Sequence, residues 1–455
     1  MKTTSNVSTE KRKRLPIRVL VSGLSLCVSS HYWGLPVLLV QGLNVQTNSN
    51  MGKSGFVRKH MKSVKDKLPV DMLVSSSDQV LQSVRQNKER IQGSKNYMKG
   101  WKHWVDMAIP SIRHELLRNL PHPIQSEEWD QLSFDLGVAA DRGQMPCFAS
   151  PGARSGYALD YFCRSRRLAG LFVDVANPTL PPFWTNEIAR GGIIHSQRDG
   201  EPSNRVVNAI AYLTGSVVQP STTSISGNTS VRLTSLGGGP GFDFVAAALA
   251  VTFTSSGDTS RLPSLQATIL DYEEGWEDLV VAMDASTRNI LQQSDWSCSW
   301  GGKCDITKPL NHLNNEACLA VISSTDIWTC QYCVVENAQK LRESHYIFFR
   351  DIWNAIPTGT IMIVTETTPR LWQEFYQSIQ EHCPFMQVAF PHQRGYQLLL
   401  RKCDPSTTSQ EDLELGVNEK DLLRNFQAMS NKHDERLRSG WERQSKKQNL
   451  QVVGG

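Results

Sequence analysis

Apolar runs of strand length alternate with amphipathic stretches between about residues 226 and 405. This alternation predicts a parallel sheet that is covered by helices on both faces. The last two runs are joined by a short connection, which makes the final strand antiparallel. The predicted fold class is therefore α/β, a doubly wound, mostly parallel seven-stranded sheet. The expected strands are 231–236, 265–272, 296–300, 317–324, 360–366, 386–390 and 396–403.

The regions on either side of this sheet have different patterns. Residues 51–125 place apolar side chains at helical spacing and carry many Lys and Arg residues, so we expect a basic helical segment. Residues 126–225 mix turn signals with a helix-like stretch and are interpreted as an accessory lead-in or cap. Residues 226–405 form the main domain, and residues 406–455 are predicted to be a charged tail with a surface helix. The whole N-terminal region is thus expected to be mainly helical.

The first fifty residues differ from the rest in composition. Residues 1–16 are basic, with the run KRKR, and an apolar stretch follows from Val19 to Val28. A basic start before an apolar stretch is typical of a targeting segment. Arg18 and His31 bound the apolar stretch on either side, so it does not reach the ~18 apolar residues of a membrane span. We favour an organelle, mitochondrion or plastid. A membrane anchor and a cytoplasmic protein are the alternatives, and membrane contact is expected only if the leader is retained.

The cysteines raise the question of a metal site. Ten cysteines in a chain of 455 residues are spread too widely for a disulfide-stapled scaffold, which favours a reducing compartment. Cys298, Cys304, Cys330 and Cys333 could bind zinc as four thiolates. The first pair is loosely spaced, however, so buried free thiols are the preferred interpretation. No essential metal is expected.

Positive charge gathers near the N-terminus, although the net charge of the chain is only +4. In residues 51–125, Tyr97, Trp101 and Trp104 lie among the Lys and Arg residues. Aromatic rings among cations are typical of a surface that stacks on bases and contacts phosphates. The alternative is a solvated helix face whose tryptophans reach into a core. RNA bound through residues 51–125 is the candidate partner.

A glycine cluster, LGGGPGFDF, follows the first predicted strand. Ligands bind beyond the carboxyl ends of the strands in doubly wound sheets. A dinucleotide fingerprint, G-x-G-x-x-G, would use Gly237 and Gly239 but meets Phe242 at its third glycine. The spacing G-x-G-x-G, formed by Gly237, Gly239 and Gly241, suits a cofactor without a pyrophosphate, such as S-adenosylmethionine. The alternative for these glycines is a tight strand-to-helix turn.

Two aspartates follow the next two strands. Asp271 ends the second strand, about thirty residues after the glycines, where a carboxylate can accept hydrogen bonds from ribose hydroxyls. Asp305 follows the third strand and is placed to address an adenine amino group. The alternative for each aspartate is a helix cap or a solvated loop end.

Residues 229–403 resemble a class I S-adenosylmethionine-dependent methyltransferase domain through LTSLGGGPGFD, ILDYEEGW, KCDIT and CLAVISSTDIW. Within that superfamily, QYCVVENAQKL and FFRDIWNAIPTGTIMIVTETTPRLWQEF are weakly similar to ribosomal-RNA and mitoribosome-associated methyltransferase-like proteins. The resemblance implies a Rossmann-like fold and S-adenosylmethionine as cofactor. It implies that Gly237, Gly239 and Gly241 wrap the cofactor, that Asp271 binds the ribose, and that Asp305 and Ile306 flank the adenine.

The methyl acceptor is sought after the fourth strand, where the sequence SSTDIWTCQY lacks the Asn/Asp-Pro-Pro-aromatic turn of exocyclic-amine methylation. Asp326 could accept a proton, Tyr332 could stack on a planar substrate, and Glu336 could orient it; helix capping and core packing are the alternatives. RNA is preferred over protein or a small molecule as acceptor. A non-catalytic methyltransferase-like RNA-binding or ribosome-assembly factor is the second hypothesis. A nicotinamide-dependent oxidoreductase is the third, which Phe242 disfavours.

Overall fold

The computed structural model describes residues 77–82, 94–142, 146–175, 230–254, 264–381, 386–389, 396–402 and 419–453. These residues belong to one compact unit that spans Ser49–Gly455. The predicted leader, residues 1–50, lies outside the described residues, as do most of residues 51–93 and residues 176–229. Within the described part, no helix is both long and apolar enough to cross a membrane.

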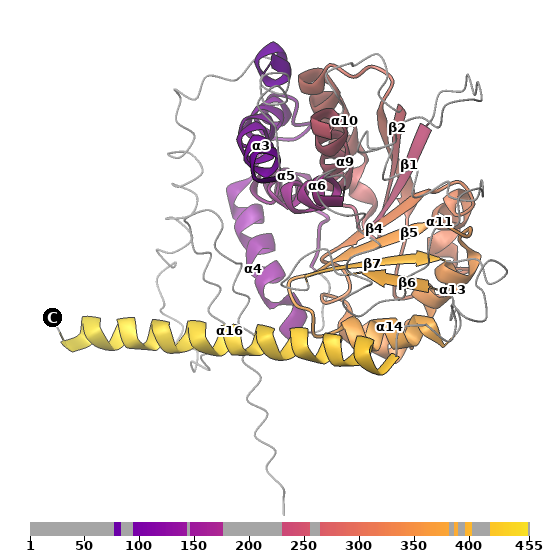
Figure 1. Ribbon diagram of the computed structural model, residues 1–455. Coiled ribbons are helices and arrows are strands. Elements are labelled where there is room, and N and C mark those ends of the chain that lie inside the picture. Colours follow the sequence, from indigo (N-terminus) through magenta and orange to yellow (C-terminus); the bar gives the residue numbers. More distant parts are fainter. Residues whose placement is uncertain are drawn as a thin grey trace, which may run out of the picture. The chain divides into compact units, whose positions relative to one another are not determined.

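A seven-stranded sheet with the strand order β3-β2-β1-β4-β5-β7-β6 forms the centre of this unit (Figure 1). The first five strands in this order pair in parallel, whereas β7 is antiparallel to both of its neighbours. The predicted sheet and its antiparallel seventh strand are therefore confirmed. The strands are β1 (Ser230–Leu236), β2 (Ser264–Asp271), β3 (Ser297–Lys303), β4 (Ile327–Gln331), β5 (Ile361–Thr365), β6 (Met386–Ala389) and β7 (Gln397–Lys402).

The position of the fourth strand was predicted wrongly. The run ACLAVISS, residues 317–324, is mostly helix α11, and the strand comes six residues after that helix, at β4. Ala and Leu favour a helix, and only one side of the run is covered: Cys318 is buried while Leu319 is exposed. All five residues of β4 are buried instead, as befits a central parallel strand.

Helices cover both faces of the sheet because alternate residues of each strand point to opposite sides. In β5, Ile361 and Ile363 pack into one core, and Met362 and Val364 pack into the other. The first core is shared with α3 (Ser94–Arg118), α5 (Pro151–Asp160), α6 (Arg164–Val175), α9 (Phe242–Thr254) and α10 (Glu277–Leu291). The second is shared with α11 (Glu316–Val321), α12 (Ala338–Glu343), α13 (Ile347–Ala355), α14 (Trp372–Gln380) and α16 (Glu419–Val453). The helix α4 (Ser126–Arg142) joins the first core through Trp129 and Leu132. The remaining elements are the short turns η2 (Glu274–Trp276) and η3 (Leu313–Asn315).

The accessory helices α3 to α6 complete the first core, in agreement with the predicted helical N-terminal region. Trp101 and Trp104 of α3 are buried, and their rings lie 5.3 and 5.7 Å from the ring of Phe253 on α9. These two tryptophans therefore do not form the exposed stacking surface considered above. They anchor α3 to the main domain, which was the alternative interpretation.

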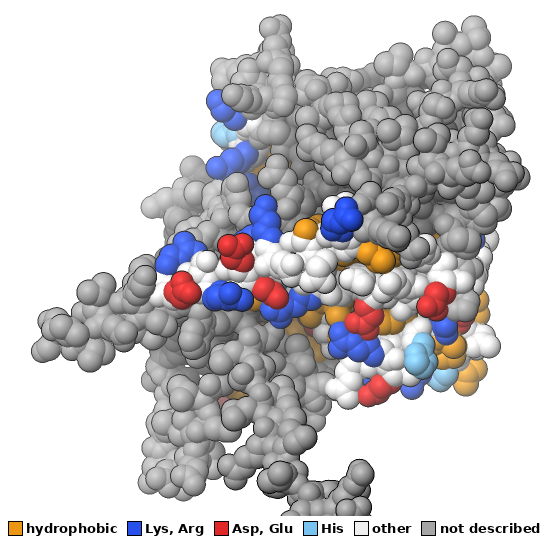
Figure 2. Space-filling view, turned by 60° about the horizontal axis from the view of Figure 1, so that its bottom comes forward, with side chains coloured by type: hydrophobic (Ala, Val, Ile, Leu, Met, Phe, Trp, Pro, Cys, Tyr) orange, Lys and Arg blue, Asp and Glu red, His pale blue; other side chains and the backbone are white. Residues whose placement is uncertain are grey.

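The C-terminal helix α16 packs through its first turns and carries mixed charges on its outer side. Leu422 and Phe426 are buried, and the ring of Phe426 lies 5.6 Å from Tyr376 of α14. Arg370 and Asp434 form an ion pair at 2.7 Å. Figure 2 shows basic and acidic side chains interspersed along this helix, so its exposed face does not have charge of one sign.

Candidate functional site

The glycine turn between β1 and α9 adopts a left-handed backbone. Gly237 and Gly239 have φ values of +60° and +51°, a backbone region that residues other than glycine rarely adopt. A Cβ at Gly237 would lie 2.2 Å from Sγ of Cys333, whereas one at Gly239 would meet nothing closer than 3.8 Å. The two glycines thus serve different purposes: the first makes room for a neighbouring loop, and the second leaves space at the sheet edge.

Asp271 ends β2 directly beside this turn. Its carboxylate accepts hydrogen bonds from the backbone N–H groups of Gly239 at 2.9 Å and Glu273 at 3.1 Å. The side chain is 5% exposed, and burial raises its pKa to about 6. The carboxylate therefore holds the glycine turn in place and still has lone pairs for a ligand.

The loop after β3 lies next to Asp271 in the sheet. Asp305 accepts hydrogen bonds from the backbone N–H of Thr307 at 2.9 Å and from its hydroxyl at 2.6 Å. The buried side chain of Asn315 donates to three carbonyl groups of this loop and accepts from the N–H of Asp305 at 2.7 Å. Ile306 is buried at 6% exposure. The loop is therefore fixed in shape.

One pocket lies where the carboxyl ends of these strands meet, at the point where the strand order reverses between β1 and β4. It brings together six residues that the sequence had singled out for the cofactor or the acceptor: Gly237, Gly239, Asp271, Asp305, Ile306 and Glu336. The other lining residues are Phe148, Tyr157, Arg164, Tyr272, Trp276, Cys304, Gln331, Cys333 and Asn337. Gly241 does not line it; its positive φ of +93° shapes the start of α9.

The three acceptor candidates lie in three different places. Asp326 precedes β4, and its carboxylate accepts from the N–H of Arg232 at 3.0 Å, so it lies at the wrong end of the strand and outside the pocket. Asp326 was expected after the fourth strand because that strand was predicted at residues 317–324 instead of at β4. Tyr332 has a positive φ of +64° and also lies outside the pocket lining. Glu336 lines the pocket. Burial raises its pKa to about 7; the charge of Arg164 opposes this rise, and the charge of Asp271 adds to it.

The four cysteines of the considered zinc site do not gather. Cys304 is hydrogen-bonded to Cys318, and Cys333 is hydrogen-bonded to Cys330. Among the described residues, no group of three or more His, Cys, Asp and Glu side chains could hold a metal ion. Hydrogen bonding and burial raise the pKa of the Cys304 and Cys333 thiols, which makes them poor nucleophiles at neutral pH.

Two buried acids that support the pocket were missed. Asp243, in the first turn of α9, accepts hydrogen bonds from Ser235 at 2.6 Å, Thr329 at 2.5 Å and Gln331, and so ties β1 to β4. Glu366, after β5, accepts from the N–H groups of Val334 and Val335. Burial and the charge of Glu336 raise the pKa of Glu366 to about 8. The sequence contained a signal for each of them: Asp243 is an acid within the apolar sequence FDFVAAALAV, and Glu366 is an acid at the end of the apolar strand IMIVTE.

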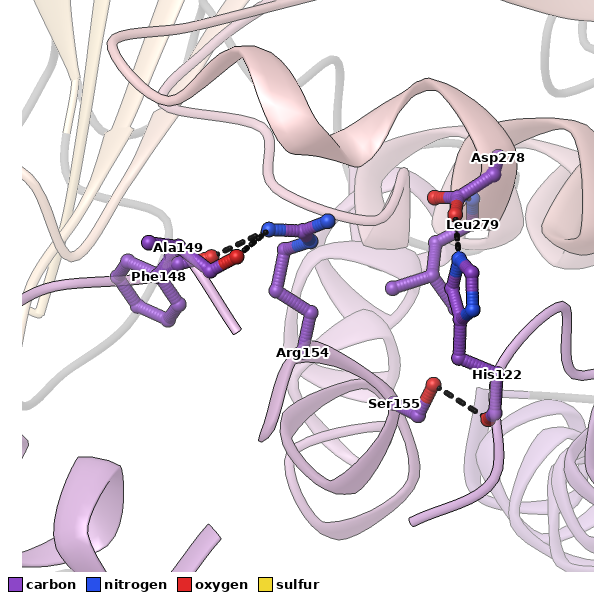
Figure 3. Close-up of polar contacts among 7 residues, drawn as sticks. All are labelled: His122, Phe148, Ala149, Arg154, Ser155, Asp278 and Leu279. Atoms are coloured by element: carbon purple, nitrogen blue, oxygen red, sulfur yellow. Dashed lines mark hydrogen bonds and ion pairs between the residues drawn. The ribbon is translucent and has the colours of Figure 1, made fainter. Parts of the chain in front are cut away.

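The accessory helices supply one wall of the pocket, which the sequence did not reveal. The ring of Phe148 lies 5.2 Å from Tyr157 and 5.1 Å from Trp276. Figure 3 shows how this wall is held: Arg154 donates to the carbonyl groups of Phe148 and Ala149, while His122 contacts Asp278 of α10 at 2.7 Å. Hydrogen bonds therefore hold the residues of the wall to one another and hold the accessory helices to α10 of the main domain.

The chemistry of the lining suits a nucleoside that carries further polar groups. Asp271 can accept from ribose hydroxyls, and the buried side-chain oxygens of Gln331 and Asn337 have no donor among the described residues. The cavity volume is about 50 Å³, well below the roughly 300–1,000 Å³ of typical ligand pockets. A nucleoside can therefore enter only if part of the lining moves outward.

Neither a protein-family model nor a curated protein sequence matches this chain. Comparison of folds finds, among other solved structures, several that are described as S-adenosylmethionine-dependent methyltransferases. They include a putative enzyme from Streptococcus mutans (12% identity, 43% of this chain and 48% of that chain, TM-score 0.26) and a putative class I enzyme from Listeria monocytogenes (10% identity, 66% of this chain and 89% of that chain, TM-score 0.29). This chain thus spans about half the length of the first of them.

Proposed function

We propose that this chain is an S-adenosylmethionine-dependent methyltransferase whose cofactor binds in the pocket at the switch point of the sheet. The observation that carries the proposal is the hydrogen bond from the N–H of Gly239 to Asp271. It joins a left-handed glycine turn to a buried carboxylate at the ends of adjacent strands. Asp305 and Ile306 follow on the next strand, so the nucleoside would lie across β3 and β2 and the methionine part across β1 and β4.

The surroundings of the glycine turn disfavour a dinucleotide. Phe242 occupies the third glycine position and packs its ring 5.9 Å from Tyr157, so α9 cannot approach the strand as the fingerprint requires. Asp243 follows in the first turn of α9. A carboxylate there opposes the attraction of a helix N-terminus for pyrophosphate. This supports a cofactor without phosphates over a nicotinamide cofactor.

Calorimetry of the full chain with S-adenosylhomocysteine, and with NAD⁺ in a parallel titration, tests the proposal. We expect binding of S-adenosylhomocysteine alone. Binding of NAD⁺ alone, or of neither compound, would remove the basis for a methyltransferase. S-adenosylmethionine supplies the methyl group by in-line displacement, so the protein mainly has to align the acceptor and receive a proton.

Glu336 is the described candidate best placed to receive that proton. Its carboxyl lines the pocket, has no ion pair among the described residues, and has a pKa of about 7. Because the base must be ionised, methyl transfer should rise with pH through about 7 and then level off. In Glu336→Gln this rise should disappear and the rate should fall by about 10²- to 10⁴-fold. Transfer of a labelled methyl group to total RNA across pH 5.5–9 measures both effects; an unchanged profile would exclude Glu336.

RNA remains our proposed acceptor, supported by the basic charge of residues 51–125. Lys99 and Lys102 are exposed on α3, away from the tryptophans that anchor it. If they contact phosphates, replacing both by Gln should flatten the slope of log K against log salt by about 0.7–0.9 per contact. The control variant replaces the exposed Lys308 and Lys432 by Gln, which removes the same number of positive charges. Equal slopes for the two double variants would contradict an RNA-binding role for α3.

A non-catalytic methyltransferase-like factor is the second candidate, and the narrow cavity favours it. If the lining of the pocket stays closed, the fold is kept but no cofactor enters. Incubation with labelled S-adenosylmethionine and total RNA or protein extract separates the two functions. Label transfer supports the enzyme, and RNA binding without cofactor binding supports the factor.

A further inference from the structure

Arg164 is a cation in the pocket lining that the proposed reaction does not yet use. It begins α6, and its guanidinium lies 4.4 Å from the ring centres of Tyr161 and Tyr332 and 5.4 Å from that of Tyr157. It donates one hydrogen bond, to the hydroxyl of Tyr157 at 2.6 Å. A guanidinium has five N–H donors, and Arg164 forms no ion pair with any described residue.

Two neighbouring arginines of the accessory helices, Arg154 and Arg166, lie outside the pocket lining. Arg154 donates to the carbonyl groups of Phe148 and Ala149. Arg166 pairs with Asp106 at 2.5 Å. Of these three cations, Arg164 is the one that faces the pocket with donors to spare.

The strand order determines which part of the cofactor would reach Arg164. Asp305 and Asp271 follow β3 and β2 at one end of the pocket, and Gln331 and Glu336 follow β4 at the other. Arg164 stacks on Tyr332, the first residue after β4, so it lies at the β4 end. A nucleoside at the β3 and β2 end would direct its substituent toward Arg164.

The β4 end offers both hydrogen-bond donors and hydrogen-bond acceptors. Arg164 can form a paired contact with a carboxylate, while Oε1 of Gln331 and Oδ1 of Asn337 are buried acceptors that lack a donor among the described residues. Donors and acceptors in this combination match an α-amino-acid group, which carries one carboxylate and one ammonium. A phosphate would match Arg164 but would leave the two amide oxygens without a donor.

We propose that Arg164 binds the α-carboxylate of the cofactor and selects a nucleoside that carries an amino acid. This inference rests on the proposed function. It makes the accessory helices part of the cofactor site, because a residue of α6 completes a pocket that is otherwise built at the carboxyl ends of the strands. Tyr161 and Tyr332 hold the guanidinium in position before the ligand arrives, which reduces the entropy lost on binding.

The test compares two probes on purified full-length protein: S-adenosylhomocysteine and its decarboxylated analogue, which keeps the amine and lacks only the carboxylate. In Arg164→Gln, calorimetry should show about 10- to 100-fold weaker binding of S-adenosylhomocysteine and unchanged binding of the analogue. Arg164→Lys should lose less. Arg166→Gln, which removes a cation outside the pocket lining, should bind both probes as the wild type does.

Three outcomes overturn the inference. If Arg164→Gln weakens both probes equally, Arg164 has a structural role in the wall; if it weakens neither, Arg164 does not contact the cofactor. If the wild type binds neither probe, the proposed function itself fails, and this inference fails with it. The first two results leave the proposed function standing because the wild type still binds S-adenosylhomocysteine.

Discussion

Replacing Gly237 by alanine should destabilise the protein and abolish cofactor binding. The new Cβ would lie 2.2 Å from Sγ of Cys333, at a residue whose φ is +60°. Overpacking costs about 1–3 kcal/mol, and a left-handed backbone costs an L-residue roughly 1–2 kcal/mol more. We therefore expect a loss of about 2–5 kcal/mol in the free energy of unfolding. Urea denaturation followed by circular dichroism measures it.

Two further variants separate crowding from backbone strain. Gly239→Ala has nearly the same φ but no atom within 3.8 Å of the new Cβ, so it should lose only the strain of about 1–2 kcal/mol. Cys333→Ala removes the sulfur atom that the Cβ of Gly237→Ala would meet. The double variant should regain the overpacking part of the loss. Equal stabilities of the Gly237 and Gly239 variants, or no rescue, would show that the turn is not packed as described.

Replacing Asp271 by alanine should weaken binding of S-adenosylhomocysteine by at least about 100-fold, since each hydrogen bond to a charged group contributes about 1.5–3 kcal/mol. The variant also frees the N–H groups of Gly239 and Glu273, which loosens the glycine turn. In the wild type, affinity should fall as the pH drops through about 6, because protonation removes the carboxylate that accepts the ribose hydroxyls. The variant should lack this dependence.

Asp434→Asn is the control for this measurement. Asp434 lies on α16, and its carboxylate pairs with Arg370 outside the pocket lining. Calorimetry at pH 5, 6 and 7.5 should therefore give wild-type affinities for this variant. Wild-type affinity in Asp271→Ala would show that the ribose does not bind there.

Local signals made much of this architecture predictable. Strand-length apolar runs predicted six of the seven strands, and a short final connection predicted the antiparallel β7. The spacing of the glycines and the acid that ends the second strand gave Gly237, Gly239 and Asp271, which do lie together. These features are set by neighbours in the sequence. The failure at residues 317–324 has the same origin, since an apolar run of that length fits a strand and a half-buried helix equally well.

Long-range features could not be derived in this way. Asp243 is buried because Ser235, Thr329 and Gln331 surround it, and these lie on two strands that only the fold makes adjacent. Arg164 reaches the pocket because α6 packs on α9, and residues 176–229, which connect α6 to β1, lie outside the described residues. A single sequence contains no periodicity that reports such contacts.

The location of the cofactor is tested most directly by a crystal structure of the full chain with S-adenosylhomocysteine. We predict the ribose hydroxyls within hydrogen-bond distance of the Asp271 carboxylate and the adenine beside Asp305 and Ile306. Part of the pocket lining should have moved outward relative to the present structure. Electron density for the ligand anywhere other than at the carboxyl ends of β1, β2 and β3 would contradict the proposed site.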